Sequence, residues 1–167
     1  TTMTYLRKNL KEAGISDLLL CQKGTYRLDM RKVESDYQTL LSIKAQIDRE
    51  NWTELKKMPD IRTLCQGAYL EFRSEEWTYG IQSYVSRILH QCLRSLGSYQ
   101  MRIGKMAEAA EYLELFLREE PYSEDITKML ITAYGKLGDY KSAHHVYKEF
   151  EKLSRQEFGE EPGEEIK

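Results

Sequence analysis

The sequence predicts a mainly α-helical protein built from antiparallel helical hairpins, with a short helix and a β-hairpin at its N-terminus. Three observations support this fold class. The 167 residues include only three prolines and ten glycines, few enough for long uninterrupted helices. After Asp29, apolar residues recur at intervals of three and four, as they do on one face of a helix. Gly104 and Gly138 lie 34 residues apart, and each separates two such amphipathic runs.

The N-terminal segment predicts a helix followed by a β-hairpin. Apolar residues spaced for one helical face indicate a helix over residues 1–13, and Gly14 is placed to end it. Two short β-prone runs, 18–21 and 25–28, then surround a glycine, which is typical of a hairpin. The apolar residues of the helix are Met3, Leu6 and Leu10.

The middle of the chain predicts helices of unequal length. An amphipathic stripe indicates a helix from about Val33 to Trp52. A shorter helix is expected near Leu55–Gln66, interrupted by Pro59 because proline breaks the backbone hydrogen-bond ladder.

The clearest pattern is the repeat in the C-terminal half. At the 34-residue offset of the two glycines, Ala109 matches Ala143, and Phe116 matches Phe150. Small residues let two antiparallel helices approach closely, and glycine permits the tight turn between them. The period and residue types match the tetratricopeptide (TPR) pattern and predict two helical hairpins. Most of the aromatic residues are expected to pack within or between the repeats rather than line a ligand groove: Tyr84, Tyr99, Tyr112, Tyr134, Tyr140, Tyr147 and Phe150.

Charge and cysteine usage narrow the functional classes. The net charge of −2 argues against nucleic-acid binding along the whole chain, but residues 1–32 carry seven basic and three acidic residues, a net +4. Residues 151–167 carry three basic and six acidic residues, a net −3. Three widely spaced cysteines predict reduced, partly buried thiols. We expect a cytoplasmic protein without a membrane partner, and the start at Thr1 suggests a piece of a longer chain.

No catalytic, cofactor-binding or metal-binding motif is recognisable. The sequence lacks a phosphate-binding glycine loop and a nucleophile elbow. His144 and His145 are adjacent in a predicted helix and therefore point in different directions, which disfavours a metal pair. We predict that the protein is not an enzyme and needs no cofactor.

Residues 36–162 resemble the bacterial transcriptional activator domain, the helical domain beside the winged helix in antibiotic-regulatory activators and some response regulators. The resemblance rests on Asp36-Tyr37, Gly67-Ala68-Tyr69-Leu70, Glu76-Trp77, Gly104, Ala109-Ala110, Glu120-Pro121, Glu124, Met129, Ala133-Tyr134, Gly138, Ala143, Tyr147 and Gly159-Glu160-Glu161-Pro162. Upstream, the first helix is similar to the recognition helix of a winged helix, and the hairpin is similar to its wing. The resemblance also implies that Trp77 anchors the connector onto the helices, although a binding hot spot is the alternative.

This resemblance implies a division into three parts. Residues 1–30 would be the C-terminal part of a winged-helix DNA-binding domain. Residues 31–163 would be the TPR-like helical domain, and residues 164–167 an acidic tail.

The implied DNA contacts lie on the first helix and at the hairpin tip. Hydroxyl groups near the start of the helix would face base edges in the major groove, and basic side chains would reach phosphates. The alternative is a basic, solvent-facing helix with no DNA role. The candidate DNA-binding residues are Thr2, Thr4, Tyr5, Arg7, Lys8 and Lys23.

The leading hypothesis is a bacterial transcription regulator that binds promoter DNA through the winged helix. Its TPR-like domain would mediate dimerisation, effector sensing or contact with the transcription machinery. A receiver domain upstream would make the parent a phosphorelay response regulator. The alternative is a TPR-like protein-interaction scaffold that binds no DNA.

Overall fold

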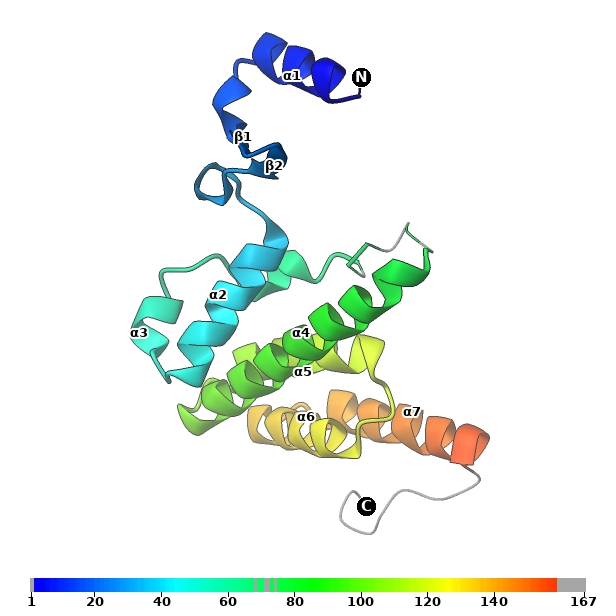
Figure 1. Ribbon diagram of the computed structural model, residues 1–167. Coiled ribbons are helices and arrows are strands. Elements are labelled where there is room, and N and C mark those ends of the chain that lie inside the picture. Colours follow the sequence, from blue (N-terminus) through cyan, green and yellow to red (C-terminus); the bar gives the residue numbers. More distant parts are fainter. Residues whose placement is uncertain (1, 68, 71–72, 74, 159–167) are drawn as a thin grey trace. The chain divides into compact units, whose positions relative to one another are not determined.

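The chain is described by a computed structural model that covers residues 2–67, 69–70, 73 and 75–158 (Figure 1). It divides into two compact units, Thr1–Thr39 and Leu40–Lys167. The described residues form seven α-helices and one two-stranded antiparallel sheet, which confirms the predicted fold class. The predicted domain boundaries stay a prediction. The expected acidic tail, residues 164–167, lies outside the described residues.

The first unit begins with the predicted helix. Helix α1 spans Thr2–Glu12. Gly14 has a φ of +74°, a left-handed conformation that glycine adopts without strain. The amide of Ile15 donates to the carbonyl of Leu10 at 2.9 Å, so the chain turns back over the last helical turn.

The predicted hairpin follows. Strand β1 (Leu19–Gln22) pairs antiparallel with β2 (Thr25–Leu28), and Gln22 lies opposite Thr25. The two turn residues, Lys23 and Gly24, have φ of 50° and 80°. Positive φ at both positions is typical of the type I′ turn, whose twist matches that of the flanking strands.

The middle of the chain differs from the sequence prediction. Helix α2 spans Asp36–Asp48, so the helix expected from Val33 to Trp52 is too long at both ends. The helix expected near Leu55–Gln66 is wrong: α3 covers only Trp52–Leu55, and a single 3-10 turn follows at Ile61–Leu64. Pro59 explains this difference because it lacks an amide donor and disfavours helical geometry in the residue before it.

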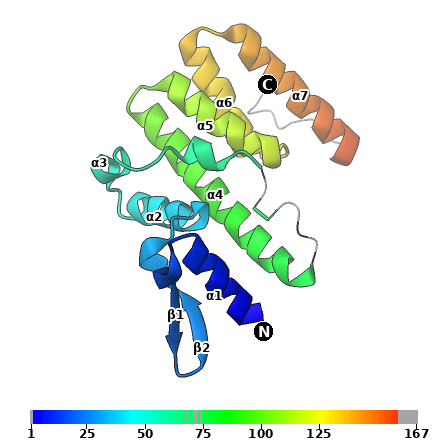
Figure 2. The same ribbon diagram turned by 90° about the horizontal axis from the view of Figure 1, so that it is seen from above.

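The two predicted helical hairpins are present. Helix α4 (Glu76–Arg102) turns into α5 (Met106–Glu119), and α6 (Glu124–Leu137) turns into α7 (Tyr140–Phe158). Gly104 and Gly138 have φ of +80° and +75° at the two turns. Each of these helices packs against the next one in sequence, as Figure 2 shows.

The core of the second unit lies among these four helices. Its central side chains are Ala110, Leu113, Ile126, Leu130 and Ala133, each at most 4% exposed. Gly97 lies in α4 directly against α5, where a Cβ atom would stand 2.8 Å from Cδ2 of Leu113. This close approach is a feature that the repeat pattern did not indicate.

Five of the seven aromatic residues named for the repeats are buried or partly buried, which confirms that most of them pack. Tyr112 and Phe150 are buried, and Tyr99, Tyr134 and Tyr147 are partly buried. Tyr99 stacks on Trp52 with ring centroids 3.9 Å apart, which holds the start of α3 on α4.

Three other aromatic residues are exposed. Tyr84 is 42% exposed, and Tyr140 is 74% exposed. Trp77 is 64% exposed, so it does not serve as the expected buried anchor.

Candidate nucleic-acid interface

The candidate DNA-binding residues are all at the surface of the first unit. Helix α1 has no buried residue, and the side chain of Tyr5 is 72% exposed. Met3 and Leu10 are partly buried, and the rest of the helix is exposed, so it presents the open face that a helix needs to enter the major groove. The exposed candidates on α1 are Thr2, Thr4, Tyr5, Arg7 and Lys8, and Lys23 is exposed at the hairpin turn.

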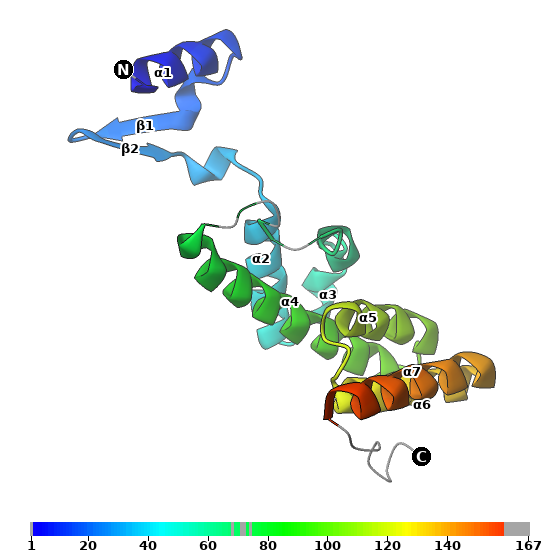
Figure 3. The ribbon, with the colours of Figure 1, turned by 90° about the vertical axis from the view of Figure 1, so that its right-hand side faces the viewer.

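A cation–π contact joins α1 to the hairpin. The guanidinium of Arg7 lies 5.0 Å from the ring centroid of Tyr26 in β2. Figures 2 and 3 show the hairpin running alongside α1, with its tip at the same end as the N-terminus of the helix. Lys23 and the first turn of α1 therefore share one end of this unit.

Three of the seven basic side chains of this unit form ion pairs within it. Lys8 pairs with Glu12 at 3.7 Å, and both side chains are more than 60% exposed, so the pair is weak and Lys8 can exchange it for a phosphate. Arg31 forms an ion pair with Asp29, and Lys32 forms one with Asp17. In the part of the chain that is described, no ion pair engages the remaining basic residues of this unit: Arg7, Lys11, Lys23 and Arg27.

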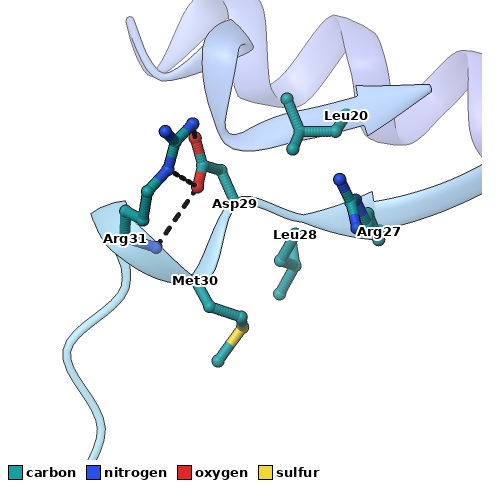
Figure 4. Close-up of a pocket in the computed structure, with 6 residues that line it drawn as sticks. All are labelled: Leu20, Arg27, Leu28, Asp29, Met30 and Arg31. Carbon is teal, nitrogen blue, oxygen red and sulfur yellow. Dashed lines mark hydrogen bonds and ion pairs between the residues drawn. The ribbon is translucent and has the colours of Figure 1, made fainter. Parts of the chain in front are cut away.

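The ion pair between Arg31 and Asp29 lies at the base of the hairpin, directly after β2. Asp29 is only 5% exposed and accepts hydrogen bonds from Nε and Nη2 of Arg31 at 2.9 and 2.7 Å (Figure 4). These hydrogen bonds lower the pKa of Asp29 from 3.8 to about 2, against the opposing effect of burial. Lys32 likewise donates to Asp17 and lowers the pKa of that carboxyl. Both carboxylates therefore remain ionised at neutral pH and keep their ion pairs beside the start of β1 and the end of β2.

A hollow of about 620 Å³ opens at this base (Figure 4). Its apolar lining includes Leu28 and Met30, which are 45% and 51% exposed. Arg27 also lines it, and Arg27 lies opposite Leu20 in the sheet. Because successive strand residues point to opposite faces, Arg27 lies on the face away from Tyr26 and α1. Arg27 is not among the candidates expected from the sequence, although side-chain alternation along β2 places it on this face.

Two of the three cysteines lie in the second unit, Cys65 partly buried and Cys92 buried. Burial raises the pKa of Cys65 to about 11 and that of Cys92 to about 12, so both thiols stay protonated at neutral pH. Cys21, in contrast to the expected partial burial, is exposed on β1. Within the described residues, no three His, Cys, Asp or Glu side chains are grouped closely enough to hold a metal ion. The helices of this part of the chain are also too short or too polar to span a bilayer.

Comparison with known families assigns the helical part of the chain. Residues 62–167 match the bacterial transcriptional activator domain. These residues include α4 to α7, and they exclude α1 and the β-hairpin. No curated protein and no solved structure matches the chain.

Proposed function

The chain belongs to the bacterial transcriptional activator domain family, a family of transcription regulators rather than of enzymes, and from this premise we propose that α1 and the β-hairpin bind promoter DNA. The observation that carries the proposal is the exposed basic helix beside a hairpin whose tip carries Lys23. A helix fits the width of the major groove, and a flanking hairpin tip reaches the neighbouring backbone.

Each candidate residue has a distinct role in this proposal. Thr2, Thr4 and Tyr5 offer hydroxyl groups to base edges. A single contact of this kind discriminates between bases less strongly than a bidentate pair, which is worth roughly 1–3 kcal/mol. Arg7 and Lys8 bind phosphates along α1. Lys23 binds a phosphate from the hairpin tip, where it is exposed.

The helical unit supplies protein contacts in this proposal. Stacked helical hairpins present an extended surface, which suits self-association, effector sensing or contact with the transcription machinery. A regulator of this kind works in the bacterial cytoplasm, where its DNA lies. A phosphorelay role would need a receiver domain and stays a prediction.

The test is a salt titration of DNA binding by the full-length natural protein. Fluorescence anisotropy would follow binding to the promoter region of its own gene and to a scrambled fragment. Each phosphate contact adds about 0.9 to the steepness of log K against log salt. We expect the slope to become shallower by roughly 2.7 in a variant with Arg7, Lys8 and Lys23 changed to alanine. Because Arg7 also contacts Tyr26, a second variant lacking only Lys8 and Lys23 should lose roughly 1.8.

The matched control removes three exposed lysines from the helical unit instead. The variant with Lys136, Lys141 and Lys152 changed to alanine has the same net charge and should keep the wild-type slope. Equal slopes for all variants, or no preference for the promoter over the scrambled fragment, would contradict the proposal. Those results would favour the protein-interaction scaffold, which the stacked hairpins of α4 to α7 also support.

A further inference from the structure

The N-terminal half of α4 carries an uncovered apolar stripe. Trp77, Ile81 and Tyr84 are 64%, 41% and 42% exposed, and their spacing of four and three places them on one helical face. The same face continues at Ile88, which is only 6% exposed because it packs in the core. Figures 1 and 2 show the cause: α4 extends beyond the end of α5, so its first turns lack the neighbour that covers its later turns.

A second row of residues runs directly beside this stripe. Glu76, Gly80, Ser83 and Arg87 follow one another at intervals of four, three and four, and all four are exposed. Gly80 is unusual because glycine weakens a helix interior. Gly97 in the same helix has a structural reason, since a Cβ atom there would meet Leu113 at 2.8 Å. At Gly80 a Cβ atom would meet nothing within 4 Å, so the fold of this chain does not require a glycine there.

The charges on the second row are self-complementary. Glu76 lies at one end of the row, and Arg87 lies eleven residues later at the other end. If the same segment of a second copy lies antiparallel across it, Glu76 of each copy comes beside Arg87 of the other. The small residues Gly80 and Ser83 then lie at the centre of the contact, where the two helices come closest.

We propose that the N-terminal half of α4, residues 76–87, is a dimerisation surface that pairs antiparallel with the same segment of a second copy about a two-fold axis. The pairing buries Trp77, Ile81 and Tyr84 of both copies and seats Tyr84 against Gly80 of the second copy. An isologous contact of this kind uses one patch twice, which is what self-complementary charges require. The inference rests on the proposed function in that it names a partner for the helical unit.

The size of the surface sets the expected strength. A single pair of half-helices buries less than the roughly 1,200 Å² typical of stable interfaces. Exposed tryptophan and tyrosine are nevertheless the residues that contribute most where they are buried at an interface. We therefore expect a reversible dimer that dissociates on dilution.

Charge reversal tests the proposed pairing in the absence of DNA. Sedimentation equilibrium of the full chain would measure the dimer dissociation constant. Glu76→Arg alone, or Arg87→Glu alone, places like charges together at both ends and should weaken the dimer by roughly tenfold or more. The double variant restores both pairs and should dimerise as the wild type does.

Mixing the two single variants gives the sharpest result. Two arginines on one chain then face two glutamates on the other, so the mixture should form heterodimers more tightly than either variant alone forms homodimers. Trp77→Ala should also weaken the dimer, whereas Tyr140→Ala removes a more exposed aromatic residue from α7 and should not. Circular dichroism would verify that each variant remains folded.

Three outcomes would overturn the inference: a wild-type chain that is monomeric at every concentration, a dimer that is insensitive to both charge reversals, or mixed variants that fail to associate. A monomer in which Trp77 resists quenching by acrylamide, measured after Trp52→Phe, would instead identify another part of the same chain as the occupant. The sedimentation experiment contains no DNA, so its result does not depend on DNA binding. A protein that is monomeric there but binds its promoter in the anisotropy experiment refutes only this inference. A dimer that binds no DNA refutes only the proposed function.

Discussion

Replacing Gly97 by alanine should destabilise the protein through one identifiable contact. The added Cβ atom would lie 2.8 Å from Cδ2 and 3.0 Å from Cγ of Leu113, closer than two such carbons can approach. Leu113 is 0% exposed, so its side chain can give way only by displacing its neighbours in the core. Overpacking of a well-packed core costs about 1–3 kcal/mol.

A second substitution isolates this cost. Alanine stabilises a helix by about 1 kcal/mol relative to glycine, and this gain opposes the steric penalty at Gly97. Gly135 lies within α6, and a Cβ atom there meets nothing within 4 Å. Gly135→Ala therefore receives the helix gain alone. The difference between the two variants should equal the steric cost, about 1–3 kcal/mol in favour of Gly135→Ala.

Urea unfolding followed by far-UV circular dichroism measures both free energies of unfolding. The penalty at Gly97 should disappear when Leu113 is also changed to alanine, since the clashing atoms are then gone, and a double-mutant cycle reports this coupling directly. If Gly97→Ala is as stable as Gly135→Ala, or if the penalty persists without the Leu113 side chain, the close approach of α4 and α5 at this point is refuted.

Three other measurements test the remaining structural claims. The folded pKa of Asp29, about 2, lies below its ordinary 3.8, so its ionised form stabilises the hairpin base above about pH 4, and this contribution is lost as the pH falls toward 2. An NMR titration should show this low pKa and its rise toward the ordinary value in Arg31→Gln; a wild-type pKa near 4 would contradict the contact. Lys23→Asn keeps a residue that tolerates positive φ, so the hairpin should persist while the salt slope of DNA binding falls by about 0.9. An unchanged slope would remove Lys23 from the interface. Ile126→Ala empties a fully buried position and should cost about 2–5 kcal/mol in urea unfolding, whereas Ile103→Ala, 43% exposed in the wild type, should cost far less; equal costs would contradict the assigned core.

The sequence alone predicted the elements whose signals are local. The turns at Gly104 and Gly138 could be predicted because a positive φ selects glycine, and the flanking apolar periodicity indicates the helices. The hairpin around Lys23-Gly24 was predictable for the same reason. Pro59 was recognised as an interruption, but the sequence could not show that it leaves only a 3-10 turn, because helix length near a breaker depends on what the segment packs against.

The candidate DNA-binding residues came from the resemblance of the first helix and hairpin to a recognition helix and its wing. The local excess of basic residues agreed with that resemblance. The cation–π contact between Arg7 and Tyr26 was not predicted, because it joins residues from two elements whose relative placement no periodicity encodes. The pairing of Asp29 with Arg31 was missed although the two residues are close in sequence, since only the chain direction after β2 brings the guanidinium onto the carboxylate.

Periodicity and turn chemistry therefore determined the class of fold, the order of its elements and the basic character of its first helix, because each depends on residues within a few positions of one another. Only the tertiary structure decided which face of α4 is covered. Its apolar stripe runs unbroken from Trp77 to Ile88 in the sequence, yet the structure buries the end that meets α5 and exposes the end that extends beyond it. An apolar side chain encodes a preference for burial, whereas the neighbour that satisfies it is set by where other helices end.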